Sequence, residues 1–464
     1  MPRLFAIAAG APLQTSALRA GVDVVLTGSV ESACVMAAVT GDIVGNPAAL
    51  LLDTTEEVRR ACAVLGAALA ERSPLVCFGP VDDGVAPVVK AVVDAGPASA
   101  AHWVAHAMHL SRKSPRGPVY VTASGGFSAH AVPIATVVQP IEPPAPDAGS
   151  LDRAAAAIRA ARHPVVIVGV DGRSDAASSW LRAFAESVPA PVLATWKGKG
   201  ALSDPHPLSF GVTRATPPAV SVLERADLLV AVGLDEVERR ALDWSGDVVD
   251  LGAVASPAER ERPAQRIVSV PGDAGTILAE LASRLGDTRS DWDVAQLDRW
   301  KRQLDPRRGP AALGLVQLVA FVREAMPAGA IAAFESSLRE AAVAWDCVAP
   351  QDLHVLARAH YHGFAIPAAV AAALAQPSTV GLAFTDHTNL AASLATLGTA
   401  ARMRTAVGVI ATGGGERTGD IGELVVPSIT AASEPALAVA LSRLLAERTP
   451  IVIDATGIRL DASV

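Results

Sequence analysis

The chain has 464 residues, of which 51% are hydrophobic and 19% charged, and its formal net charge at pH 7 is -8. No cluster of Lys and Arg stands out, so neither a nucleic-acid backbone nor an anionic membrane surface is expected as a partner. No uninterrupted apolar stretch reaches the roughly 20 residues of a membrane-spanning helix, and a chain this long is expected to form two or three domains.

The first residues and the cysteines indicate in which cell compartment the protein is expected. The apolar run after Arg3 is too short for a signal peptide and suits a first strand. Cys34, Cys62, Cys77 and Cys347 lie far apart, mostly among apolar neighbours and without CxxC spacing. This pattern predicts buried free thiols and a cytoplasmic protein, and it speaks against a nucleophilic cysteine.

Short β-rich runs alternate with Ala-rich helical segments in three successive stretches of the chain. This pattern predicts an α/β protein with three doubly wound parallel sheets, each covered by helices on both faces. The expected strands are residues 4–8, 22–26, 49–52, 75–78 and 118–121 in the first stretch, 165–168, 192–194, 228–232, 248–251 and 267–270 in the second, and 330–333, 380–384, 406–410, 424–426 and 451–453 in the third.

Two segments interrupt this alternation. Residues 140–146 are rich in proline, which predicts a stiff, extended linker. Residues 286–309 form a polar stretch rich in Asp and Arg. We therefore expect three domains, over residues 1–145, 146–305 and 306–464.

Four phrases of the second domain are distinctive. They are RHPVVIVG at 162–169, PVLATWKGKG at 191–200, DPHP at 204–207 and ADLLVAVG at 226–233. In this order and spacing they resemble the central domain of acetolactate synthase, benzoylformate decarboxylase and their thiamine-diphosphate-dependent relatives. In the second phrase, Lys197 and Lys199 are expected to be exposed turn residues.

The other two domains carry weaker parts of the same resemblance. HGFAIPAAVAAALAQP at 362–377 is similar to the family's glycine-containing turn and the helix before its metal-binding strand. AFESS at 333–337 resembles benzoylformate decarboxylase in particular, and VVLTGSVE at 24–31 lies where relatives carry His-Glu. The resemblance implies a pyrimidine-binding-like first domain and a diphosphate-binding-like third domain.

Glu31 corresponds to the family's activating carboxylate. In relatives that carboxylate drives the aminopyrimidine tautomer that removes the thiazolium proton. The resemblance therefore implies a catalytic or cofactor-facing Glu31. The alternative is a glutamate at a helix N-terminus, where the macrodipole favours a negative charge.

Relatives bind the diphosphate through a divalent metal, held by the Asp of Gly-Asp-Gly, by a later Asn and by a backbone carbonyl, a set of oxygen ligands that suits Mg²⁺. Here Asp386 keeps the aspartate, but both flanking glycines are replaced. The Asn position falls on Gly413 or Gly414, which have no side-chain oxygen, while Gly415 could still offer a carbonyl. The resemblance implies Asp386 and Gly415 as metal ligands, and the cofactor-binding positions are Glu31, Asp386, Thr388, Asn389, Gly413, Gly414 and Gly415.

Further departures surround the same site. LDTTEE at 52–57 replaces a Gly-Pro-Gly turn and an Asn of the first domain. Side chains in place of glycines obstruct close backbone approach to a phosphate. The glycines at 413–415 could instead present N–H groups to an anion, or form an ordinary turn.

Histidines offer acid–base or metal chemistry in the third domain. His360, His362 and His387 are candidates for proton transfer. His360 and His362 should point to the same side of an extended segment. A zinc or iron site that includes these histidines or His354 is an alternative.

Two functions remain open. The first is a thiamine-diphosphate enzyme that decarboxylates or ligates a 2-oxo acid or related carbonyl compound, with Mg²⁺, as a homodimer or dimer of dimers. The second is a repurposed member that does not bind thiamine diphosphate, with different chemistry in the old pocket or a non-catalytic role beside another subunit. Serine hydrolase, P-loop and Rossmann dehydrogenase motifs are absent from the sequence.

Overall fold

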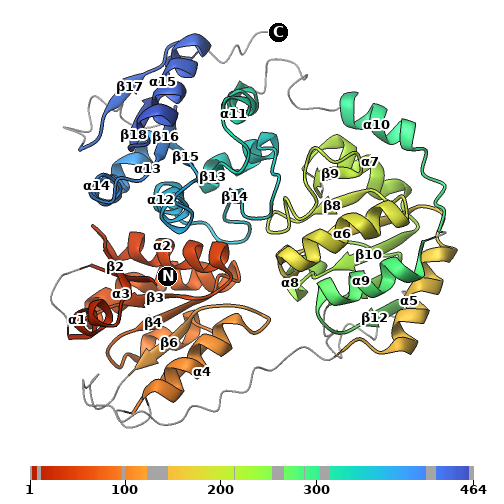
Figure 1. Cartoon of the computed structure of the whole chain (residues 1–464), viewed down its shortest axis with the longest axis horizontal. Coiled ribbons are helices and arrows are strands. Elements are labelled where there is room, and N and C mark those ends of the chain that lie inside the picture. The colour runs from red at the N-terminus through yellow and green to blue at the C-terminus, as the bar shows by residue number, and fades with distance from the viewer. Residues whose placement is uncertain are drawn as a thin grey trace. The chain divides into compact units, whose positions relative to one another are not determined.

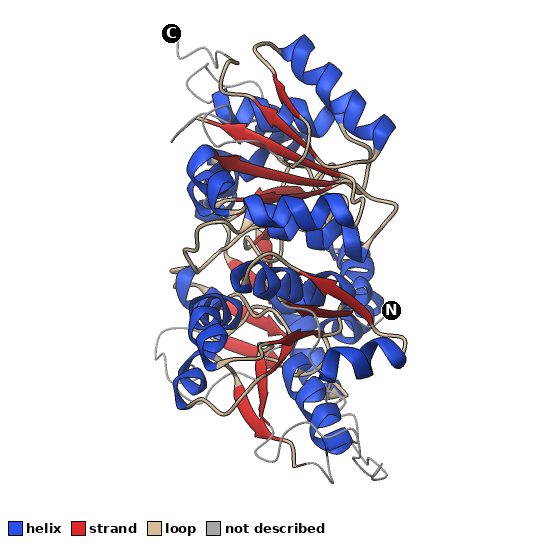
Figure 2. Cartoon of the chain, turned by 90° about the vertical axis from the view of Figure 1, so that its left-hand side faces the viewer, coloured by secondary structure: helices blue, strands red, loops and turns tan. Residues whose placement is uncertain are grey.

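The computed structural model describes residues 3–7, 12–96, 100–122, 145–213, 215–252, 266–286, 288–303, 314–413 and 425–458. In this part of the chain the strands form three sheets of six strands, with helices packed against them (Figures 1 and 2). The strand pairs are parallel in all three sheets. The predicted α/β class with three parallel sheets is confirmed.

The first sheet has the strand order β2-β1-β3-β4-β6-β5. Its strands are β1 (Arg3–Ala6), β2 (Asp23–Leu26), β3 (Ala48–Leu51), β4 (Leu75–Phe78), β5 (Ala91–Asp94) and β6 (Val119–Thr122). Its helices are α1 (Pro12–Arg19), α2 (Val30–Val44), α3 (Thr55–Ala70) and α4 (Ala100–Arg112).

The second sheet has the order β12-β11-β10-β7-β8-β9, which is the order of doubly wound nucleotide-binding sheets. Its strands are β7 (Pro164–Val168), β8 (Val192–Ala194), β9 (Ser209–Val212), β10 (Leu228–Val232), β11 (Asp247–Leu251) and β12 (Ile267–Val270). The helices here are α5 (Ala148–Ala160), α6 (Asp175–Ser187), α7 (Pro217–Arg225), α8 (Glu236–Ala241), α9 (Ala274–Arg284) and α10 (Val294–Gln303).

The third sheet, β14-β13-β15-β16-β18-β17, repeats the topology of the first. Its strands are β13 (Ile331–Phe334), β14 (Leu353–His354), β15 (Gly381–Asp386), β16 (Val407–Thr412), β17 (Ser428–Thr430) and β18 (Ile451–Asp454). The helices are α11 (Gly314–Ala325), α12 (Ala365–Ala375), α13 (His387–Ala392), α14 (Leu394–Arg402) and α15 (Glu434–Glu447), and a 3-10 segment covers Ser336–Ala344.

The described part of the chain divides into two compact units. One unit contains residues 1–140, 325–339 and 354–459, and therefore both the first and the third sheet. The other contains the described residues of the ranges 145–324 and 340–353. The three predicted domain ranges stay a prediction, but the first and third sheets share one unit.

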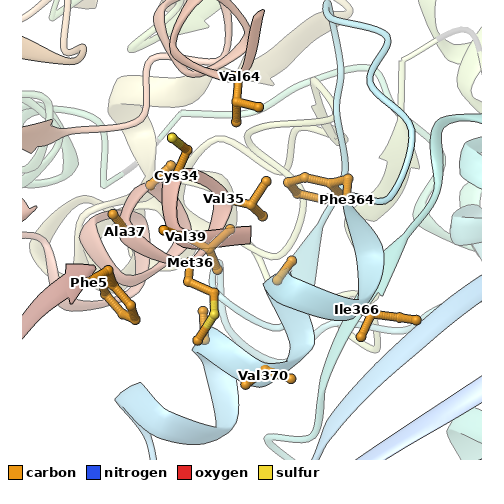
Figure 3. Packing of buried hydrophobic residues seen from close by; sticks show 14 of the residues in the cluster. Phe5, Cys34, Val35, Met36, Ala37, Val39, Val64, Phe364, Ile366 and Val370 are labelled. Atoms are coloured by element: carbon orange, nitrogen blue, oxygen red, sulfur yellow. The ribbon is translucent and has the colours of Figure 1, made fainter. Parts of the chain in front are cut away.

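Helices α2 and α12 form the core shared by these two sheets. Alanine-rich α12 is buried from Ala365 to Leu374, and α2 is buried along nearly its whole length. The two helices pack against each other and contribute to one apolar cluster with Phe5 of β1. Figure 3 shows side chains of α2 lying between Phe5 and α12. Both helices are apolar on all sides because neither has a face in solvent.

The segment at 52–57 begins a helix. Thr54 is the N-cap of α3 and accepts a hydrogen bond from the Glu57 N–H at 3.2 Å. The Glu57 carboxylate accepts in return from the Thr54 N–H, which completes a capping box. The residues that replace the family's Gly-Pro-Gly turn therefore have a local structural role.

The expectation that Lys197 and Lys199 are exposed is wrong. Lys197 is 8% exposed and Lys199 only 3%. Lys199 forms a buried ion pair with Asp204, and Asp204 also accepts a hydrogen bond from the Cys347 N–H at 2.7 Å. The turn that contains Lys197 and Lys199 is buried because residues 340–353 pack over it within the same unit.

The cysteines behave as predicted. All four are free thiols, three of them buried and Cys62 half-buried. Burial raises the pKa of Cys34, Cys77 and Cys347, which keeps those thiols protonated and unreactive. Among the helices that the structure describes, none is long and apolar enough to cross a membrane.

Candidate functional site

The candidate site lies at the carboxyl edge of the third sheet. The strands that follow β13 in sequence, β14 and β15, lie on opposite sides of it, so the strand order reverses there. Ligands of open α/β sheets bind outside the carboxyl ends of the strands at such a point. Glu335 directly follows β13, Asp386 ends β15 and Gly413 directly follows β16.

Asp386 is the N-cap of α13, and both of its carboxylate oxygens accept hydrogen bonds. Oδ1 accepts from the Asn389 N–H at 2.8 Å. Oδ2 accepts from the Asn389 side-chain amide at 2.8 Å and from the Ser337 hydroxyl at 3.2 Å. The carboxylate is therefore engaged by the chain's own groups.

Asn389 connects Asp386 to the turn before α12. Its side chain is 3% exposed, and its Oδ1 accepts from the Gly363 N–H at 2.9 Å. Gly363 has a φ of +80°, which favours glycine at this turn. The neighbouring Thr388 is exposed and has no part in this network.

Glu335 is a buried carboxylate at the N-terminus of α12. Its Oε1 accepts from the Ala365 N–H at 2.9 Å, and its Oε2 accepts from the Gly363 and Phe364 N–H groups at 3.2 and 3.3 Å. Burial raises the pKa of Glu335 to about 7, although these three N–H groups oppose the shift; the negative charge of Asp386 adds to it. The carboxyl group can therefore change its charge near neutral pH.

Two bulky side chains replace the family's glycines. Thr385 is fully buried, and His387, the first residue of α13, is 1% exposed. The His387 Nε2 lies 3.7 Å from Asp454 Oδ1, and neither imidazole nitrogen has a hydrogen-bond partner among the residues described. His387 therefore lies beneath the surface of the site, and its acid–base role stays a prediction.

The described residues do not fit a magnesium–diphosphate group. Asp386 is present, but its two oxygens already accept three hydrogen bonds from Asn389 and Ser337. The Asn389 amide is also occupied on both sides, and Gly413 supplies no side-chain oxygen. The predicted positions Gly414 and Gly415 lie outside the described residues.

Glu31 lies in the first turn of α2, whose N-cap is Ser29. Its carboxylate forms a two-pronged ion pair with Arg60 of α3: Arg60 Nη2 donates to Oε1 at 3.0 Å and to Oε2 at 2.9 Å. The side chains are 31% and 51% exposed, respectively. The negative charge is thus neutralised by Arg60, which no sequence motif links to Glu31.

The N-terminus of α2 packs tightly against α14. The Ser32 and Thr396 hydroxyls are hydrogen-bonded at 2.6 Å. A Cβ atom placed on Gly28 would lie 2.4 Å from the Ala395 Cβ, closer than such atoms approach. Gly28 is therefore required for this close contact between the first and third sheets' helical layers.

The His-x-His pair points outward. His360 and His362 are both exposed, as expected for alternate residues of an extended segment, and Tyr361 between them is half-buried against the shared core. Burial, with the charges of Glu31, Cys34 and Glu335, raises the pKa of Tyr361, so the phenol stays protonated at neutral pH. Sequence reasoning selected the two histidines and missed the tyrosine that lies within electrostatic range of both glutamates.

No zinc or iron centre is formed by the residues described. Within the described ranges, no group of three or more His, Cys, Asp or Glu side chains could hold a metal ion. His354 is buried in β14, whereas His360 and His362 are exposed. The alternative of a histidine-based metal site therefore has no support.

The comparisons with known proteins agree with this architecture. The family described as thiamine pyrophosphate enzyme, central domain, matches residues 151–281. Acetolactate synthase of Mycobacterium bovis is 30% identical over 160 residues, which cover 33% of this chain and 26% of that protein. The probable 2-ketoarginine decarboxylase AruI of Pseudomonas aeruginosa is 27% identical over 246 residues, 51% of this chain and 43% of that one.

Solved structures are similar over nearly the whole chain. The thiamine diphosphate-dependent 4-hydroxybenzoylformate decarboxylase of Rhodococcus jostii RHA1 has a TM-score of 0.79 at 21% identity, and covers 98% of this chain and 96% of its own. Benzoylformate decarboxylase of Polynucleobacter necessarius has a TM-score of 0.76 at 17% identity, covering 99% and 96%. At these identities the likeness concerns the fold alone.

Residues 151–281 therefore match the central domain of thiamine pyrophosphate enzymes, and the whole chain shares its fold with thiamine-diphosphate-dependent decarboxylases. The chain covers about a quarter of the length of the acetolactate synthases that it matches in sequence. The activity and substrates of those proteins are therefore not transferred to it by the match.

Proposed function

We propose that this chain is a repurposed member of the superfamily that works without thiamine diphosphate. The observation that carries the proposal is the state of Asp386, whose two oxygens accept hydrogen bonds from Asn389 and Ser337. A metal would have to compete with these donors, and Gly413 offers no side-chain oxygen as a second ligand.

The remaining acidic groups at the site are also engaged. Glu335 caps α12 through three N–H groups and is 1% exposed, and Glu31 is held by Arg60. Because each of these carboxylates is already bound by groups of the chain itself, the geometry favours a non-catalytic partner-subunit role over new chemistry in the old pocket.

A second candidate is favoured by one observation. Glu31 remains at the N-terminus of α2, where the resemblance places the activating carboxylate. This candidate is a thiamine-diphosphate enzyme that decarboxylates or ligates a 2-oxo acid, for which release of Glu31 from Arg60 would be required.

Calorimetric titration of the metal-stripped protein with thiamine diphosphate and Mg²⁺ separates the two. The proposal expects no heat of binding up to about 1 mM ligand, a concentration that detects even weak complexes. An acetolactate synthase titrated under the same conditions is the positive control. Micromolar binding that Asp386→Ala weakens would refute the proposal and favour the second candidate.

A restored site provides a matched comparison. The triple substitution Thr385→Gly, His387→Gly, Gly413→Asn brings back the family's metal motif at the described positions. A Cβ atom at Gly413 would meet nothing within 4 Å, so the asparagine has room. Binding by the restored variant alone would support loss of the cofactor site through these residues.

We also propose a homodimer or dimer of dimers, as the family implies. Size-exclusion chromatography with light scattering tests this, and a mass of a single chain would contradict it.

A further inference from the structure

A cavity of about 310 Å³ lies in the unit that contains the second sheet, and none of its lining residues belongs to the site above. Its wall is formed by residues of the segment 199–207, by β9, the start of α7, the end of α10 and residues 343–346. All of these segments belong to the same compact unit. The volume is at the low end of the roughly 300–1,000 Å³ typical of small-molecule sites.

Lys199 brings a buried positive charge to this wall. Its side chain is 2% exposed, and Asp204 is its partner. Burial alone would lower the pKa of Lys199, but Asp204 and Cys347 raise it above its ordinary value, so the ammonium stays charged. An ammonium has three N–H donors, and among the described residues it meets one acceptor.

Other hydrogen-bond donors share the cavity. Lys301 of α10 donates to the carbonyls of Asp204 and His206 at 2.7 and 2.6 Å, which leaves one of its three N–H groups. Ser209 also lines the cavity, and its side chain is buried.

Thr216 is the N-cap of α7, but its hydroxyl makes no capping hydrogen bond. It lines the cavity instead, together with Pro218 of the first turn. The N-terminus of a nine-residue helix therefore adds a partial positive charge at the same wall.

The acidic groups of the wall do not cancel this surplus of donors. Asp204 pairs with Lys199, and Asp298 pairs with Arg302. Asp346 also lines the cavity. The net charge of the lining residues is therefore close to zero. The lining residues offer more N–H and O–H donors than acceptors, which favours a ligand with acceptor oxygens. Phe210 and Val343 provide an apolar part of the wall.

We propose that this cavity binds a small organic carboxylate with an apolar body, its oxygens accepting from Lys199, Lys301, Ser209 and Thr216 and its hydrocarbon part lying against Phe210 and Val343. None of these residues belongs to the candidate site described above. Either a 2-oxo acid or a free amino acid carries the required group.

Four probes of one carbon skeleton test the proposal by calorimetry and thermal shift. They are 4-methylpentanoate, 4-methyl-2-oxopentanoate, L-leucine and the uncharged 4-methylpentanamide. We expect the three carboxylates to bind with dissociation constants of about 10 mM or lower, and we expect no binding of the amide. Tighter binding of the oxo acid would identify a 2-oxo acid as the source, and tighter binding of leucine an amino acid.

Variants assign the binding to this wall. Thr216→Val and Ser209→Ala remove hydroxyls that make no described hydrogen bond, so the fold should persist, and each should weaken binding about 5-fold or more. Lys301→Met should weaken it further, whereas Lys113→Met, an exposed lysine of the first domain, should change nothing. Absence of carboxylate binding, equal binding of the amide, or unchanged affinity in Thr216→Val and Ser209→Ala would overturn the proposal.

Discussion

Replacing Glu335 by Gln removes the one buried carboxyl group at the site whose pKa is raised to about 7. In the unfolded chain a glutamate has its ordinary pKa of 4.5, so between these values the folded chain holds a proton that the unfolded chain has lost. The associated stability is therefore fully present below pH 4.5 and is lost as the pH rises through 7.

The difference between 7 and 4.5 corresponds to about 3 kcal/mol in the free energy of unfolding. Glutamine does not titrate. Wild-type protein should therefore lose about 2 to 3 kcal/mol relative to Glu335→Gln between about pH 5 and pH 8. Urea unfolding of both proteins across this range measures the difference, and all groups common to the two cancel.

Two further measurements test the effect of Glu335 ionisation. Hydrogen exchange of the peptide that contains α12 should accelerate with pH in wild-type protein more than in Glu335→Gln, because ionisation of buried Glu335 at the start of this helix lowers the stability of the folded state. Asp386→Asn should shift the wild-type transition to lower pH, since the charge of Asp386 contributes to the raised pKa. A stability difference that stays constant with pH would refute this account of Glu335; the raised pKa of Tyr361 keeps that neighbouring phenol protonated over the same range in both proteins.

Three other changes have defined outcomes. Asn389→Ala leaves the Gly363 N–H without its amide acceptor and should cost about 1–3 kcal/mol in urea unfolding, whereas exposed Thr388→Ala should change it by less than about 0.5 kcal/mol. Lys199→Met should cost about 3–5 kcal/mol because it leaves Asp204 buried without its cation, and adding Asp204→Leu should restore part of that loss; purely additive costs would contradict the pairing. Gly28→Ala should destabilise the first unit by about 1–3 kcal/mol because its Cβ meets α14, and an unchanged melting temperature would show that this contact is loose.

The sequence predicted five strands in each sheet, and the structure has six. The missed strands, β5, β9 and β14, all lie at sheet edges. An edge strand pairs on one side only, so it needs less apolar sequence than a central strand. The four residues of β5 are mostly exposed or half-buried, and β14 has only two residues, so neither forms a recognisable apolar run. The strand expected at 424–426 was found a few residues later, at Ser428–Thr430.

The sequence indicated the acidic residues of the candidate site but not their hydrogen-bond and ion-pair partners. Asp386 ends β15 and Glu31 begins α2, yet Ser337 and Arg60, which engage them, come from other elements and carry no motif. Glu335 belonged to the AFESS phrase of the resemblance, but nothing local indicated that it caps α12 from 30 residues away.

The sequence by itself determined the parallel α/β class, the likeness of the central domain to thiamine pyrophosphate enzymes and the absence of a Gly-Asp-Gly motif around Asp386. These features depend on local periodicity and on short sequence motifs. Tertiary structure alone decided which charges are paired. Lys199 is in a turn of ordinary composition, and only the packing of residues 340–353 over it makes it a buried cation beside Asp204. Burial and pairing are set by segments distant in sequence, so no local pattern could reveal them.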